Sequence, residues 1–218
     1  MKRKLYLLTA IILSLSLFLS ACGQKDIGEA KAKEIGLKYI NQYFNANETE
    51  AKITLEKQEC YRDASGALVT SGDSEFSERW IYYVRVPLAS SMTKYEALII
   101  ASTGEVIYAY QSNVNIRLSD EQKKQASELY METSEWEEKH MDALQSLTRA
   151  CFDWAKEKFN DNHLILLDAN NGVIPPVKIR EFGRSYYVVT RDGKVYTVSM
   201  SWPSLELISI EVENGLLF

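Results

Sequence analysis

The sequence is poor in the residues on which most metal and catalytic sites depend. Its 218 residues include 2 histidines and 3 cysteines, none at the spacing of a zinc, haem or dithiol motif. Glycine (10) and proline (4) are also scarce, which excludes a collagen-like or low-complexity chain. A phosphate-binding loop and a nucleophile elbow are absent as well. We therefore expect no metal, no cofactor and no catalytic residue, and we predict that the protein is not an enzyme.

An apolar run at the amino terminus extends from Leu5 to Leu19 and contains three hydroxyl residues. Three basic residues at positions 2–4 precede it. A basic start followed by a short apolar run is typical of a secretory signal peptide. Because a membrane-spanning helix needs about 20 apolar residues, a permanent transmembrane anchor is the weaker interpretation. We predict a signal peptide over residues 1–21.

The end of this run, Leu19-Ser20-Ala21-Cys22-Gly23, resembles the bacterial lipobox. The resemblance implies that Cys22 is lipidated and becomes the first mature residue, with residues 22–26 as a tether. Acyl chains would hold the protein on a membrane without a span. We therefore expect a cell-membrane protein, lipid-anchored and facing the extracytoplasmic side. An ordinary cleavage site with a chance cysteine is the alternative.

Positive charge is scarce after the predicted cleavage. The mature chain would keep 22 basic residues against 30 acidic ones, a net charge of about −8 compared with −5 for the full chain. No basic stripe is present that could neutralise phosphates. A nucleic-acid partner is therefore not expected.

Hydrophobic periodicity predicts helices and antiparallel strands in two similar halves. In the first half, a capping box at Asp26 to Glu29 starts a helix that ends near Phe44, and a long polar loop covers 62–79. The predicted strands are Lys52–Tyr61, Trp80–Val86, Lys94–Ala101 and Glu105–Gln111.

Helical periodicity returns at Ser119, which caps a helix to about Glu132, and at Ser134, which caps a second helix to about Phe159. The strands predicted after it are His163–Asp168, Val177–Phe182, Ser185–Arg191, Lys194–Trp202 and Leu205–Val212.

Short identities relate the two halves. Tyr82-Tyr83-Val84 matches Tyr186-Tyr187-Val188, and Phe44-Asn45 matches Phe159-Asn160. We predict an α+β fold of two tandem modules, 27–112 and 134–218, each a helix on an antiparallel meander, joined by a helical linker over 113–133. Chance similarity of two generic units is the alternative.

The first half resembles a PepSY-type module over about residues 27–112. The resemblance is carried by the helix at 29–40, by the strand at 80–86 and by the segment 95–107, where Thr103-Gly104-Glu105-Val106 is the most recognisable part. The second half has Arg191-Asp192-Gly193-Lys194 and departs from the pattern. PepSY modules occur in peptidase propeptides and bacterial envelope proteins, so the resemblance implies regulation of a peptidase. These modules share no catalytic residues, so the resemblance assigns none to this chain.

These observations predict a lipid-anchored extracytoplasmic module for protein interaction or regulation, with an envelope protein or peptidase as partner and the membrane bound through Cys22. A lipoprotein that binds a small ligand between its modules is the alternative. An envelope hydrolase is a third and weaker one, because no catalytic constellation is present.

The remaining reactive residues have structural interpretations. His140, on a helix stripe, and His163, at a helix-to-strand junction, are predicted to be partly buried imidazoles. Cys60 and Cys151 are predicted to be free thiols, with a disulfide as the alternative. Residues 168–172 depart from a calcium loop and are predicted to form a turn.

Strands 80–86 and 94–101 are apolar on both faces, since Ile81, Tyr83, Leu98 and Ile100 lie opposite the face that a helix would cover. We expect that the other module or the helix after Ser119 covers this second face and that the two modules dock through it. An external partner is the alternative.

Overall fold

The computed structural model describes residues 26–62, 68–69, 75–88, 92–129, 136–174 and 182–213. Its helices are α2 (Glu29–Tyr43), α3 (Asp120–Leu129) and α4 (Trp136–Phe159), with a short 3-10 helix η1 (Asn113–Asn115). Its strands are β1 (Lys52–Arg62), β2 (Leu68–Val69), β3 (Glu75–Pro87), β4 (Thr93–Ile100), β5 (Val106–Gln111), β6 (Ile165–Ile174), β7 (Phe182–Val189), β8 (Val195–Trp202) and β9 (Leu207–Val212).

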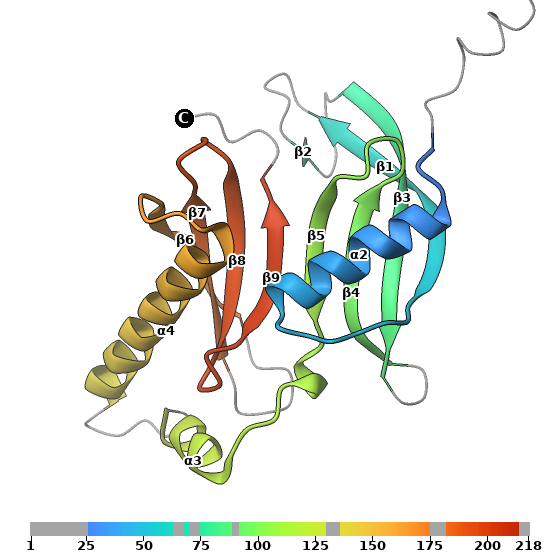
Figure 1. The fold of residues 1–218 in the computed structure, drawn as a ribbon. Coiled ribbons are helices and arrows are strands. Elements are labelled where there is room, and N and C mark those ends of the chain that lie inside the picture. The colour runs from blue at the N-terminus through green and yellow to red at the C-terminus, as the bar shows by residue number, and fades with distance from the viewer. Residues whose placement is uncertain are drawn as a thin grey trace, which may run out of the picture.

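The nine strands form one antiparallel sheet in the order β2-β1-β3-β4-β5-β9-β8-β7-β6 (Figure 1). With the helices it gives an α+β fold, as predicted. The strands of the first half meet those of the second where β5 pairs with β9, through Tyr108 with Glu211, Ala109 with Ile210 and Tyr110 with Ser209. The expected docking through the second face of the first sheet is therefore wrong. The halves join edge to edge, because β5 and β9 each end a meander and pairing satisfies their backbone groups.

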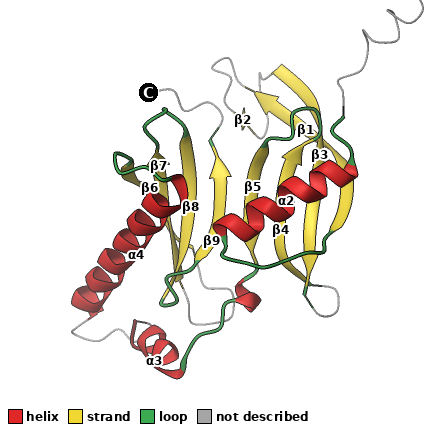
Figure 2. Ribbon diagram, viewed as in Figure 1, coloured by secondary structure: helices red, strands yellow, loops and turns green. Residues whose placement is uncertain are grey.

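Both long helices pack on the same face of this sheet (Figure 2). α2 crosses β1, β3, β4 and β5, and α4 crosses β7 and β8. The register continues one face through Ala97, Ala109, Ile210 and Val198, so one core runs under both helices. The helices bury small or apolar residues against it: Ala32, Gly36 and Ile40 from α2, and Ala143, Leu147, Cys151 and Ala155 from α4.

Gly36 sets how closely α2 approaches the sheet. A Cβ atom added to it would lie 2.7 Å from the Cβ, Cγ1 and Cγ2 atoms of Val84. Val84 is fully buried in the strand beneath the helix. The glycine is therefore required by close packing, which outweighs its cost of about 1 kcal/mol in a helix.

The start of α2 differs from the predicted capping box. Gly28 is the N-cap residue, with a φ of 81° and no side-chain cap. The Asp26 carboxylate instead accepts hydrogen bonds from the Gly28 N–H at 2.9 Å and from the Tyr82 hydroxyl at 2.8 Å. Tyr82 lies far away in the sequence, and its buried hydroxyl needs a partner, which explains why the local pattern misled.

The predicted cap of α3 is confirmed. Ser119 and Gln122 cap α3 reciprocally, with hydrogen bonds of 2.9 and 3.2 Å. Asn45 and Asn160, which follow α2 and α4, have left-handed φ values of 51° and 49°. Asparagine tolerates this conformation at the end of a helix.

Two loop predictions are wrong. The polar segment 62–79 contains β2 and the first residues of β3. The turn predicted at 168–172 lies within β6, where the register with β7 shifts between Asp168 and Val173. An irregular strand pairing has no local sequence signal that separates it from a turn. The strand predicted at Val177–Phe182 falls largely outside the described residues, as do residues 1–25.

Candidate functional site

The cysteines and histidines singled out by the sequence belong to β1, to α4 and to the junction between α4 and β6. Cys151 is buried and free, and burial raises the pKa of its thiol. His163 is exposed rather than partly buried. The side chains of Cys60 and His140, like the whole of Cys22, lie outside the described residues.

Metal binding and membrane crossing can be examined over the same residues. Within the described ranges, no three His, Cys, Asp or Glu side chains come together in a way that could hold a metal ion. Nor does any helix there have the length and apolar character needed to cross a membrane.

The sheet face that points away from α2 and α4 carries a group of tyrosine and charged side chains, which we call the tyrosine face: Tyr83, Arg85, Glu96, Tyr108 and Tyr110. The register arranges them in two rows across β3, β4 and β5. The first row consists of Tyr83, Leu98 and Tyr108. The second row consists of Arg85, Glu96 and Tyr110. In β9, Glu211 extends the first row and Ser209 the second.

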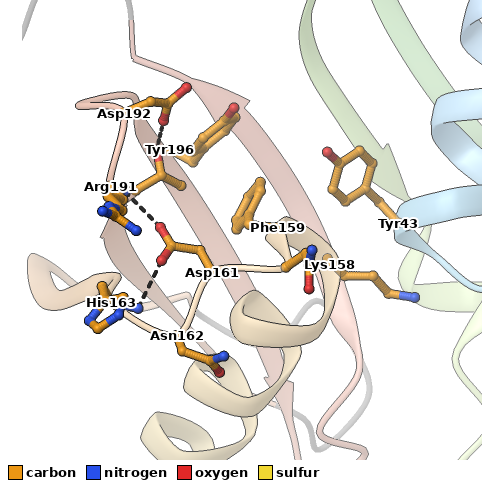
Figure 3. A pocket seen from close by; sticks show the side chains of 11 residues that line it. Tyr43, Lys158, Phe159, Asp161, Asn162, His163, Arg191, Asp192 and Tyr196 are labelled. Atoms are coloured by element: carbon orange, nitrogen blue, oxygen red, sulfur yellow. Dashed lines mark hydrogen bonds between the residues drawn. The ribbon is translucent and has the colours of Figure 1, made fainter.

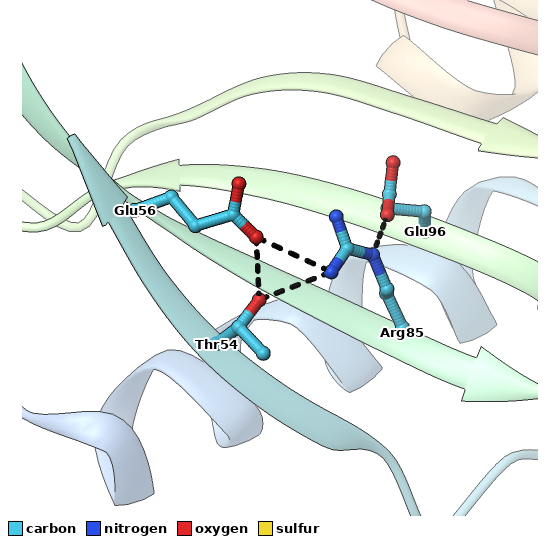
Figure 4. Close-up of polar contacts among 4 residues, drawn as sticks. All are labelled: Thr54, Glu56, Arg85 and Glu96. Atoms are coloured by element: carbon cyan, nitrogen blue, oxygen red, sulfur yellow. Dashed lines mark hydrogen bonds and ion pairs between the residues drawn. The ribbon is translucent and has the colours of Figure 1, made fainter. Parts of the chain in front are cut away.

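Arg85 is held in place from two sides (Figure 4). Its Nε donates to the Glu96 carboxylate, and its Nη1 donates to Thr54 Oγ1 at 3.1 Å and lies 3.5 Å from Glu56 Oε1. The guanidinium lies 4.5 Å from the centroid of the Tyr83 ring, a cation–π distance. Burial opposes the charged form, but the hydrogen bond and charge of Glu96 outweigh it, so the pKa of Arg85 is raised. The group is a fixed cation at neutral pH.

The three tyrosines of this face are partly exposed. Burial is the main cause that raises the pKa of Tyr83, Tyr108 and Tyr110, so their hydroxyls stay protonated and can donate hydrogen bonds. The Tyr108 and Tyr110 rings lie 5.9 Å apart. Ordered tyrosines beside a fixed arginine are the side chains that dominate binding energy at protein interfaces.

The structure shows how far this face is covered. Ile81 is fully buried, whereas Tyr83, Leu98 and Ile100 keep part of their surface exposed. α3 packs against α4, and Gln122 in α3 bonds to the Pro203 carbonyl at 3.3 Å. Over the ranges that the structure describes, neither α3 nor α4 covers this face, although such a cover was expected.

A second site lies where the carboxyl ends of α2 and α4 converge with the turn between β7 and β8 (Figure 3). We call it the helix-end pocket. It is open to solvent and has a volume of about 810 Å³. Aromatic rings line its inner part: Phe159 stacks on Tyr196 at 4.5 Å, and Tyr43 lies 6.0 Å from Phe159. Polar side chains complete the lining, among them Lys158, Asp161, His163, Arg191 and Asp192.

The carboxylates of this pocket are used within the fold. Asp161 accepts hydrogen bonds from the backbone N–H of Arg191 at 2.7 Å and of His163 at 2.8 Å, which lower its pKa. Asp192 accepts one from the Thr190 hydroxyl at 2.6 Å, which lowers its pKa. Both groups stay ionised: Asp161 ties the loop after α4 to the β7–β8 turn, and Asp192 holds that turn from within.

The pocket also marks contact between the halves. Trp154 Nε1 donates to the Tyr43 carbonyl at 3.3 Å, and Lys158 Nζ donates to Asn45 Oδ1 at 2.5 Å. Beside it, the buried Tyr39 hydroxyl has no hydrogen-bond partner in the described part of the chain. Burial, with neighbouring Tyr43 and Tyr196, raises the pKa of Tyr39. A buried donor without a partner is costly, so this position would favour a polar atom from outside.

Sequence reasoning had not assigned a site to these residues. Arg85 and Glu96 could have been found as opposite charges inside two apolar strands, a pattern that predicts a cross-strand pair. The pairing of Asp161 with the Arg191 backbone has no such signal, because it depends on two loops brought together by the fold.

Comparison with known proteins adds one structural neighbour. No protein-family model matches the sequence, and no curated protein matches it either. The solved structure of the Bacillus megaterium YpeB C-terminal domain aligns with a TM-score of 0.42 at 11% identity, over 88% of this chain and 66% of that chain. This chain thus spans just under two thirds of that neighbour's length. A likeness this weak assigns no function.

Proposed function

We propose that the protein is a lipid-anchored extracytoplasmic module that binds another envelope protein through the tyrosine face. One observation carries the proposal: α2 and α4 share one face of a continuous sheet, so neither helix covers the opposite face, where the partly exposed Tyr83, Tyr108 and Tyr110 lie with a fixed Arg85. A peptidase is the partner class that the PepSY resemblance of residues 27–112 implies.

We further propose that the second half is a diverged copy of this module. Residues of the two helices that share an offset of 115 are buried alike, namely Ala32 with Leu147 and Ile40 with Ala155. Tyr82 of β3 and Tyr186 of β7 are matched residues of the Tyr-Tyr-Val identities. The hydroxyl of each forms a hydrogen bond, Tyr82 with Asp26 and Tyr186 with Thr148. These correspondences support a repeat in which loops, rather than the helix and sheet, have diverged.

Site-specific crosslinking in intact cells tests the interaction. A photoreactive phenylalanine analogue at Tyr110 should give a discrete adduct with an envelope protein, whereas the same analogue at Glu157, exposed on α4, should not. Adding Tyr108→Ala should remove most of the adduct, since losing a hot-spot tyrosine at an interface costs about 2 kcal/mol or more. Equal adducts at both positions, or an adduct indifferent to Tyr108→Ala, would contradict the proposal.

The anchor is tested separately by mass spectrometry of the mature protein. We expect the amino-terminal peptide to begin at Cys22 and to carry acyl chains, because the lipobox cysteine is the residue that processing leaves first. Cys22→Ser should release the protein from membranes. An unmodified wild-type chain found in the medium would show that the lipobox interpretation is wrong.

A second candidate function is binding of a small ligand in the helix-end pocket. The unpartnered Tyr39 hydroxyl beside Tyr43 and Tyr196 favours it. The crosslinking experiment separates the two candidates. A small molecule that copurifies with the protein, with no adduct at Tyr110, would support the pocket over the tyrosine face.

A further inference from the structure

Trp80 and Leu55 form an exposed apolar pair on the face that carries the helices. Trp80 is 51% exposed and Leu55 38%. Trp80 lies opposite Lys57, and Leu55 lies opposite Tyr82, so the two apolar side chains are diagonal neighbours on one face of β1 and β3. Tyr82, between them and the core, is buried. An apolar or interfacial environment would bury the exposed surface of this tryptophan and leucine and would therefore be favourable.

The chain enters the fold beside this pair. The Ile27 N–H donates to the Ala101 carbonyl, and the Ala101 N–H donates to the Trp80 carbonyl, each at 2.9 Å. The Asp26 carboxylate accepts the Tyr82 hydroxyl at 2.8 Å. α2 starts next to Tyr82 and continues over Val84, which leaves Trp80 beyond the first turn of the helix. Trp80 therefore lies beside the place where residues 26 and 27 enter the fold.

Chain length then limits the distance to the proposed anchor. Three residues lie between Cys22 and Asp26, so the two Cα atoms are four steps apart along the chain, and four steps span at most about 14 Å. Acyl chains on Cys22 would thus keep residue 26, and Trp80 beside it, close to the bilayer surface. Tryptophan is enriched at the level of lipid headgroups, where its ring is partly apolar and its N–H meets water.

We infer that Trp80 and Leu55 insert into the headgroup region of the membrane that anchors the protein. The partner of these two side chains is thus a lipid surface. The inference rests on the proposed anchor at Cys22. The contact is driven by apolar burial, because Asp26 and Glu29 beside it are acidic and the mature chain is net negative. It would give the anchored protein one docked orientation on the membrane.

Fluorescence quenching in vesicles tests the contact. The acylated protein is reconstituted into phosphatidylethanolamine and phosphatidylglycerol vesicles that include lipids brominated near the headgroup. Tryptophan emission should be quenched in the wild type, and Trp80→Phe should lose most of that quenching. As a matched control, Met141, which is 53% exposed on α4, is replaced in a Trp80→Phe, Met141→Trp double variant, which should not regain it.

Vesicle flotation measures membrane attachment independently of the Trp80 contact. If the protein floats with the vesicles but Trp80→Phe quenches like the wild type, the contact is refuted and the anchor stands. If the purified protein does not float, the anchor fails. In that case, a polyhistidine tag replaces residues 1–22 and holds the protein on nickel-chelating lipids. Quenching of Trp80 there would support the contact, and an unquenched Trp80 would overturn it.

Discussion

Gly36→Val should lower the free energy of unfolding by about 3 kcal/mol or more, one of the two largest effects expected in this protein. The new side chain would start from a Cβ position 2.7 Å from three atoms of Val84. Val84 is fully buried between Ile53 of β1 and Ala97 of β4 and has no long side chain that could swing aside. α2 would have to lift from the sheet, which uncovers Ile40 and Ala32. Denaturant unfolding of the variant measures the loss.

A double-mutant cycle provides the control. Gly36→Ala alone should destabilise, although alanine is favoured over glycine in a helix by about 1 kcal/mol. Val84→Ala should make room, so the double variant should lose less stability than the sum of the two single variants. A more stable Gly36→Ala protein would show that the helix does not need this close approach.

Residues 24–116 expressed alone should aggregate or melt at least about 10 °C below the full chain. The fragment would lose the β9 partner of Tyr108, Ala109 and Tyr110 and expose a strand edge that is normally internal. The Gln111 amide would lose its 2.6 Å hydrogen bond to the Leu207 carbonyl, and Tyr43 would lose its contacts with the second half. Each lost backbone hydrogen bond is worth about 1 kcal/mol, and an open edge invites pairing with other chains.

Complementation supplies the control for this second experiment. Coexpressed residues 117–218 should restore solubility and raise the melting temperature, because they return β9. A monomeric fragment that melts cooperatively at the full-length temperature would mean that the halves are independent and that their edge pairing contributes little.

Local signals explain which parts of the fold could be predicted. The stripe in α2, the two strands predicted at 94–101 and 105–111 and the helix that carries Cys151 depend on residues near in sequence, and they were found. The pairing of β5 with β9 joins strands about 100 residues apart. The sequence of an edge strand does not indicate which other strand it pairs with. Asp26 was misassigned for the same reason, since its partner Tyr82 is distant.

The candidate site was anticipated only in part. Alternation in β3 and β4 already showed that Tyr83 and Leu98 face away from the covering helix. What covers that face depends on how the halves join, and the sequence predicted docking through it because docking would bury its apolar side chains. The structure instead extends the sheet, so the exposed tyrosines and Arg85 became visible as a site only with the topology known.

The irregular register of β6 also affects how these molecules behave when crowded. β6 is the last strand of the sheet, and Ile165 and Leu167 on it are exposed. Regular pairing with β7 lasts from Ile165 to Asp168 before the register shifts, and Asp168 forms an ion pair with Arg184. A charged residue and a shift in register both blunt a strand edge. A neighbouring copy would find only a short template for strand pairing at this edge of the sheet.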